Sequence, residues 1–319
     1  NTLSGVLEFD QRNGNTRNFV GNFRLGSSES AFTFEGPLFR GDNEEANTSY
    51  IFSVRRSYLQ VLFKAIGLPF LPDYWDYQYK VNHRFNTRNE LLITGVGSID
   101  NSSVNDIEEF DAEQKAIQDQ VPVLAQQSNT LGLRWRHRFS NNAGFMDVVL
   151  SQNNLYNRFS RYQDNVNESG LYFENDANEI EQKLRHQFKL FVNNWTYSFG
   201  YSLQHVLYDN NTLDLVNSWE FNSNLRFLRY GAYAQASSNW LDDRLQLSAG
   251  FRIDDNSFMN DNTGLIAQFS PRLSASYTLD RAGKVKWNQS WGIYYKIPPY
   301  TVLGYQDNLG LWVNQSSKY

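Results

Sequence analysis

The sequence predicts an all-β protein, a transmembrane antiparallel β-barrel, on three observations. Aromatic residues make up 16% of the 319 residues although the mean hydropathy is only -0.58. Apolar and polar residues alternate with a period of two along many segments of about ten residues. Short and long connections between these segments also alternate along the chain.

A lipid-facing barrel explains the composition. Only every second side chain of a barrel strand contacts lipid, and tryptophan and tyrosine gather at the two membrane interfaces. The other half of each strand stays polar, which keeps the mean hydropathy low. No apolar run of the sequence reaches the roughly 18 residues that a membrane-spanning helix needs.

The clearest alternation covers residues 195–208, where aromatic residues and leucines are interleaved with serine, threonine, glycine and glutamine. The pattern returns at residues 131–139, 245–253, 273–279 and 285–293. The whole chain gives about thirteen strands, many near ten residues, which is the length of a tilted spanning strand and exceeds the five or six usual in soluble sheets.

The connections fall into two classes. Short turns are predicted at residues 85–90, 140–144, 192–195, 241–244 and 280–284, and long loops at residues 64–73, 101–129, 163–178, 209–229 and 258–267. Outer-membrane barrels have tight turns at the periplasmic rim and long loops at the extracellular rim. The alternation therefore predicts this kind of barrel and orients it.

The sequence offers little for enzymatic chemistry. It has no cysteine, which excludes disulfides, cysteine-bound zinc and thiol catalysis. Its four histidines lack ligand spacing, and no nucleotide-binding loop or serine-nucleophile elbow occurs. The net charge is -5 with dispersed basic residues, which argues against a nucleic-acid partner. We therefore expect neither an enzyme nor a cofactor.

One acidic stretch, residues 254–262, has oxygen-bearing side chains that calcium accepts as ligands. They are Asp254, Asp255, Asn256, Asn260, Asp261 and Asn262. The spacing lacks the glycine and the distal glutamate of an EF-hand. A calcium site and an ordinary solvated loop both remain open.

Several stretches resemble TonB-dependent outer-membrane receptors. Residues 3–9, LSGVLEF, and the QRNG that follows at 11–14 resemble the last strand of the receptors' plug domain and its link to the barrel. FSPRLS at 269–274 and WGIYYKIPPY at 291–300 resemble a strand pair of the middle of the barrel, and residues 230–254 are similar too. Residues 55–77 look most like the receptors of Bacteroidota.

The resemblance implies a domain organisation. Residues 1–14 would be the end of a plug domain with its link, and residues 15–319 the N-terminal portion of the barrel. Barrels of this family have 22 strands, so about thirteen make a partial barrel. An odd number of strands ends at the opposite rim from its start and does not close by itself. We therefore expect a fragment.

The resemblance also implies a function, the energy-coupled uptake of a scarce solute across the outer membrane of a Gram-negative bacterium. The solute would be a siderophore, cobalamin, an oligosaccharide or a peptide. The implied partners are outer-membrane lipid, the TonB complex acting through the plug, the solute and a surface lipoprotein. A passive porin-like or fatty-acid-type channel and a non-transporting docking or assembly subunit remain as alternatives.

Two sets of residues are candidate ligand contacts. Arg134, Arg136 and Arg138 share one face of a predicted strand, where they either pair with acidic plug residues or attract an anionic substrate. Aromatic residues of the predicted outer loops are suited to a sugar or a siderophore; they are Tyr172, Phe173, Trp219 and Trp312. The aromatic residues predicted for the interfacial girdle are Trp195, Trp240, Trp287, Trp291 and Tyr295.

Overall fold

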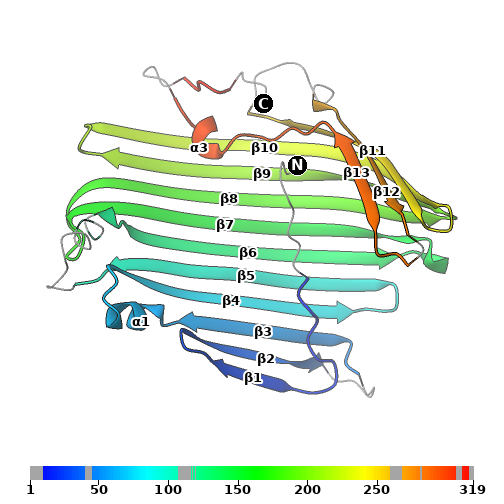
Figure 1. The fold of residues 1–319 in the computed structure, drawn as a ribbon, viewed down its shortest axis with the longest axis horizontal. Coiled ribbons are helices and arrows are strands. Elements are labelled where there is room, and N and C mark those ends of the chain that lie inside the picture. Colours follow the sequence, from blue (N-terminus) through cyan, green and yellow to red (C-terminus); the bar gives the residue numbers. More distant parts are fainter. Residues whose placement is uncertain are drawn as a thin grey trace.

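The computed structural model describes residues 10–39, 45–106, 116, 118, 120–258, 268–280, 282–306 and 311–315. In this part of the chain, 13 antiparallel strands form one sheet in which every strand pairs with its neighbours in sequence (Figure 1). The strands are β1 (Val20–Leu25), β2 (Glu29–Phe39), β3 (Thr48–Ser57), β4 (Phe70–Arg84), β5 (Asn89–Val104), β6 (Val123–Arg138), β7 (Gly144–Asp164), β8 (Ser169–Val192), β9 (Trp195–Asp214), β10 (Trp219–Trp240), β11 (Leu245–Asn256), β12 (Ser270–Thr278) and β13 (Lys286–Gly292).

The sheet is curved, with its concave face toward the viewer in Figure 1. Among the described residues, β1 and β13 each pair on one side only, so the sheet is open. The prediction of an all-β partial barrel with about thirteen strands is therefore confirmed.

Besides the helical residues 116, 118 and 120, the named helices of the described ranges are short. They are α1 (Leu59–Ala65), the 3₁₀ turn η1 (Ser140–Asn142) and α3 (Tyr300–Leu303). No helix in the described ranges is long and apolar enough to cross a membrane.

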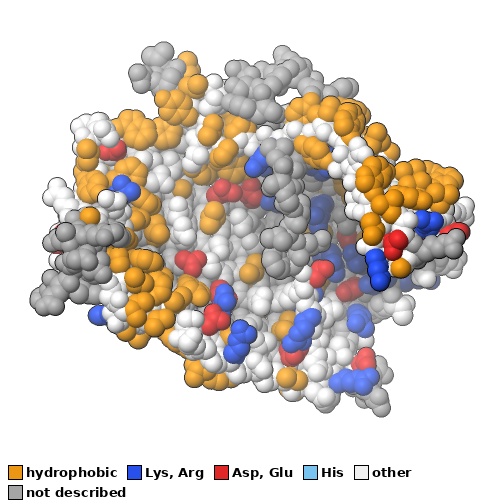
Figure 2. All heavy atoms as spheres, in the orientation of Figure 1, with side chains coloured by type: hydrophobic (Ala, Val, Ile, Leu, Met, Phe, Trp, Pro, Cys, Tyr) orange, Lys and Arg blue, Asp and Glu red, His pale blue; other side chains and the backbone are white. Residues whose placement is uncertain are grey.

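The two faces of the sheet differ because side chains alternate along every strand. On the convex face, cross-strand partners are apolar, as where the rings of Phe188 and Phe199 stack at 5.0 Å. On the concave face, partners are polar, as in the row Arg136, Asp147 and Gln187. Figure 2 shows charged side chains gathered over the middle strands of this concave face. The convex face is the one suited to lipid.

The apolar band on the convex face has an outer limit. Outward residues of β7, β8 and β9 are apolar up to Leu150, Leu184 and Leu203, with the exception of His186 of β8. The next outward positions carry polar residues, among them Gln182 and His205. The band of β9 thus runs from Trp195 to Leu203, which fits the 9–11 residues of a tilted spanning strand.

The prediction of a long loop is wrong at two places. Most of residues 163–178 and 209–229 belongs to β7, β8, β9 and β10, and only residues 165–168 and 215–218 turn. These strands have 20 to 24 residues, about twice what the bilayer requires. Their outer halves therefore extend past the apolar band as paired strands. The predicted short turns are confirmed where the structure describes them.

Polar side chains hold these projecting strands together. The amide of Asn175 donates to Asn210 Oδ1 and to Thr212 Oγ1, both at 2.7 Å. The turn after β7 is closed by Asp164 Oδ1, which accepts from the backbone N–H of Asn167 at 3.1 Å. Strands of this kind lack the apolar alternation of a membrane strand, so a period-two pattern does not detect them.

The chain enters the barrel along its inner face. The guanidinium of Arg12 binds the Glu35 carboxylate of β2, with Nη2 2.7 Å from Oε1. The carbonyl of Gln11 accepts from Lys80 Nζ of β4. The Ala46 N–H donates to the Thr16 carbonyl at 3.0 Å. Residues 10–17 therefore line the inner wall before β1 begins.

Gly144, at the start of β7, is expected to tolerate no side chain. Its φ is +137°, and an added Cβ would stand 2.0 Å from the carbonyl oxygen of Lys189 on the paired strand β8. We expect Gly144→Ala to reduce sharply the fraction of the full-length protein that reaches the folded, heat-modifiable form on gels.

The matched control for this prediction is Gly67→Ala. Gly67 also has a positive φ, +71°, but nothing lies within 4 Å of an added Cβ. Gly67→Ala should therefore lower the free energy of unfolding by only about 1 kcal/mol, because a residue with a side chain disfavours a positive φ. Equal folded fractions for the two variants would show that the contact with Lys189 is unimportant.

Candidate functional site

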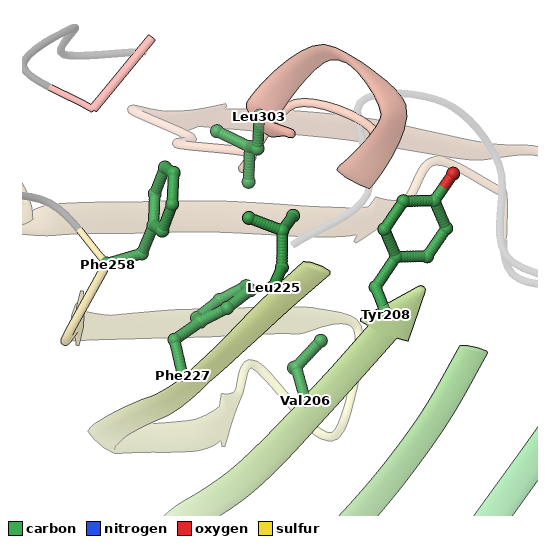
Figure 3. Packing of buried hydrophobic residues seen from close by; sticks show 6 residues of the cluster. All are labelled: Val206, Tyr208, Leu225, Phe227, Phe258 and Leu303. Atoms are coloured by element: carbon green, nitrogen blue, oxygen red, sulfur yellow. The ribbon is translucent and has the colours of Figure 1, made fainter. Parts of the chain in front are cut away.

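A short segment after the last strand folds back into the barrel. Residues 293–299 leave the sheet, and α3 lies against the inner face of β9 and β10 (Figure 1). We call residues 293–306 the inner segment. Leu303 of α3 is fully buried and points toward Leu225 in Figure 3. It belongs to a buried cluster with Val206, Tyr208, Leu225, Phe227 and Phe258.

A polar contact anchors the other end of α3. The Tyr300 hydroxyl donates to Glu181 Oε1 of β8 at 2.5 Å. The same carboxylate oxygen accepts from Gln204 Nε2 of β9 at 2.7 Å. Burial, together with the hydrogen bond to Glu181, raises the pKa of Tyr300. The phenol therefore keeps its proton and remains a donor.

A cavity of about 100 Å³ lies between the inner segment and strands β9 to β11. It is lined by Ser202, Gln204, Arg229, Tyr230, Arg252, Asp254, Asp255, Asn256, Gln268, Tyr295, Lys296, Ile297 and Pro298. Arg252 and Asp254 form an ion pair, and the Tyr230 hydroxyl donates to Asp255 at 3.2 Å. The lining presents both signs of charge, which suits a polar solute.

The predicted arginine row lies on the inner wall of β6. Arg136 holds Asp147 of β7 through Nε and Nη2, both at 2.7 Å. Arg138 Nη2 lies 2.7 Å from Glu90 of β5. The wall itself thus supplies acids to two of the three arginines. Arg134 keeps a buried Nε without a hydrogen-bond partner among the described residues.

Three of the four predicted loop aromatics lie in strands instead. Tyr172 and Phe173 belong to β8, and Trp219 begins β10. This follows from the long polar strands, which replace the expected loops. Phe173 contacts Phe159 edge to face, with centroids 5.7 Å apart.

The structure brings two of these aromatics toward the inner segment. Trp219 stacks on Phe221 at 5.6 Å, and Phe221 stacks on Tyr305 of the inner segment at 6.0 Å. Trp312 meets Phe258 of the buried cluster edge to face at 5.9 Å. No ring or ion contact joins these aromatics to the arginine row within the described residues.

Sequence reasoning missed the site's central residue. Tyr300 was expected near a strand pair, and Tyr295 in the interfacial girdle. Tyr295 lines the inner cavity instead, because the chain leaves the sheet after Gly292. Pro298 and Pro299 were the available signal, since proline cannot donate to a sheet ladder.

The possible calcium ligands are only partly visible. Asp254 is paired with Arg252, and Asp255 accepts from Tyr230. Asn260, Asp261 and Asn262 lie outside the described residues. Where the chain is described, no group of three or more histidine, aspartate or glutamate residues could hold a metal ion.

An apolar convex face, a charged concave face and two segments packed on the concave face define a partial β-barrel of the membrane type. A family model described as TonB dependent receptor-like, beta-barrel matches residues 73–314. The chain therefore belongs to the TonB-dependent receptor-like β-barrel family. No curated protein matches it.

Solved structures agree in fold. A mutant of the ferric enterobactin receptor PfeA from Pseudomonas aeruginosa is 14% identical, with a TM-score of 0.61 over 91% of this chain and 45% of that one. The copper transporter OprC is 11% identical, with a TM-score of 0.65 over 93% and 48%. The ferripyoverdine receptor of Pseudomonas aeruginosa is 14% identical, with a TM-score of 0.60 over 83% and 41%. The chain thus spans about half the length of these structures, and identities this low show the fold alone.

Proposed function

We propose that this chain is part of a TonB-dependent receptor that imports a scarce solute across the outer membrane of a Gram-negative bacterium. The observation that carries the proposal is that two segments pack on the concave face of the sheet. Residues 10–17 and the inner segment both pack on the charged inner wall. Segments on the inner wall suit a transporter that must be opened by energy, and family membership supports the same mechanism.

The entering segment supports a particular domain organisation. In this proposal residues 1–14 are the end of a plug domain and its link, and residues 15–319 are the N-terminal portion of the barrel. The contacts of Gln11 and Arg12 with the inner wall fit a chain that arrives from inside the barrel. The TonB complex would act through that plug.

The solute is proposed to be polar and charged, with a ferric siderophore as the first choice. The mixed charges of the inner cavity support this class. So do the solved relatives, which include receptors for ferric enterobactin and ferripyoverdine. Arg134, with its unpartnered Nε, is the member of the arginine row best placed to meet an anionic group. Tyr172, Phe173, Trp219 and Trp312 remain proposed contacts.

The test is uptake of iron-loaded siderophore by host cells that lack the gene, with the full-length gene restored in strains with and without TonB. Import restored only where TonB is present supports the proposal. Restored import that does not need TonB would instead identify a passive channel. Siderophores, cobalamin, oligosaccharides and peptides are each tested. If loss of the gene leaves the uptake of all four unchanged, the protein is a docking or assembly subunit.

A further inference from the structure

The convex face of β10 to β12 has an unusually low floor. Alanine occupies three consecutive outward positions of β10, Ala232, Ala234 and Ala236, of which only Ala236 belongs to the groove described below. Ala236 pairs with Ala249 of β11, and Ala275 continues the floor on β12. Alanine carries a single methyl group, so the sheet backbone lies close to the surface here.

Ala236, Ala249 and Ala275 form the floor of a groove, and tryptophans stand on both sides of it. Trp195 of β9 stands on one side, and Trp287 and Trp291 of β13 stand on the other. Their side chains are 40%, 48% and 60% exposed. With Leu247 and Leu273 they enclose a groove of about 440 Å³. We call it the Trp–Ala groove.

The groove lies at the rim of the short turns. Trp195 is the first residue of β9, and Trp287 is the second residue of β13. Short turns mark the periplasmic side of an outer-membrane barrel. Tryptophan belongs at membrane interfaces, where acyl chains meet the glycerol ester layer. The groove is therefore continuous with the apolar band and opens to the periplasmic leaflet.

One polar side chain faces outward in this wall. Gln289 lies between Trp287 and Trp291 in the outward register of β13 and lines the groove. No hydrogen bond to its amide is formed by any residue in the described part of the chain. An amide facing hydrocarbon is costly unless it finds a partner. A lipid ester or phosphate oxygen at this depth supplies an acceptor.

We propose that the Trp–Ala groove binds one glycerophospholipid of the periplasmic leaflet. An acyl chain lies on the alanine floor between the tryptophans, and Gln289 Nε2 donates to an ester or phosphate oxygen. A single polar group in an apolar groove suits a lipid better than a protein surface, which would need more polar contacts at its rim. This inference rests on the proposed outer-membrane location and is independent of transport.

Native mass spectrometry of the full-length receptor in detergent, with added phosphatidylethanolamine, tests the proposal. Ala236→Phe fills the floor of the groove and is expected to reduce the bound lipid at least about tenfold. Ala232→Phe is the matched control, because it makes the same change on the same face of β10 outside the groove, and it should leave binding unchanged. Gln289→Leu keeps the groove but removes the donor, and should weaken binding about fivefold.

The amount of the folded, heat-modifiable form on gels is measured for each variant, so that lipid binding is compared only between folded proteins. Equal lipid binding by wild type, Ala236→Phe and Ala232→Phe would overturn the proposal. So would a wild-type dimer that Ala236→Phe separates without loss of lipid, since the groove would then be an interface between copies. Failure of TonB-dependent uptake would leave the lipid result intact, so the two proposals fail separately.

Discussion

Asp147→Ala is expected to lower the free energy of unfolding by about 3 kcal/mol. The Asp147 side chain is only 2% exposed and binds both Nε and Nη2 of Arg136. Its removal leaves the partly buried Arg136 guanidinium unpaired beside the charge of Arg134. Urea unfolding of the full-length protein in detergent, followed by tryptophan fluorescence, measures the loss.

An exposed ion pair on the other face provides the control. Arg158 and Asp176 lie on the projecting part of β7 and β8, with side chains 49% and 26% exposed. Asp176→Ala should cost no more than about 1 kcal/mol, because exposed pairs contribute little. The double variant Arg136→Met, Asp147→Leu should regain most of the loss. Equal losses for Asp147→Ala and Asp176→Ala would contradict the argument from burial.

The membrane part of this fold was predictable from sequence because one physical rule governs it. Lipid on one side and water on the other impose a period of two, as in residues 195–203, where every outward residue is aromatic or leucine. The tight turns were equally visible, since they interrupt that pattern. Strand number, order and open form follow directly from both signals.

The projecting strands were not predictable by the same rule. Around Asn175 and Asn210 the strands extend past the apolar band, and their inward side chains are polar even where they are buried, as Asn210 is. Their pairing depends on side-chain hydrogen bonds across strands, such as the one from Asn175 to Asn210. Asparagine and aspartate favour turns and loops in isolation, and tertiary pairing overrides that preference here.

Only one part of the candidate site was predictable from sequence, namely the arginine row on the inner wall. The inward register of Arg134, Arg136 and Arg138 follows from alternation, but their acids come from β5 and β7, and a single sequence does not reveal such partners. Tyr300 and Glu181 are 119 residues apart. Their contact depends on where the inner segment folds against the concave face, which local sequence patterns do not reveal.

Leu303→Ala is expected to loosen the inner segment without unfolding the barrel. Leu303 is fully buried in the cluster with Val206, Leu225 and Phe227, and a buried leucine truncated to alanine costs about 3 kcal/mol. The backbone N–H groups of Leu303 and Gly304 donate to the carbonyls of Pro299 and Tyr300. Their protection against hydrogen exchange should fall about a hundredfold, because local opening sets their exchange.

Val302→Ala tests whether burial is the cause. Val302 is the neighbouring residue of α3, but its side chain is 43% exposed, so protection should change by less than about threefold. Tyr300→Phe removes the hydrogen bond to Glu181 and should lower protection about tenfold. A larger effect for Tyr300→Phe than for Leu303→Ala would mean that the polar anchor, and not the apolar cluster, holds the inner segment. A ligand that competes for Glu181 would then be enough to release it.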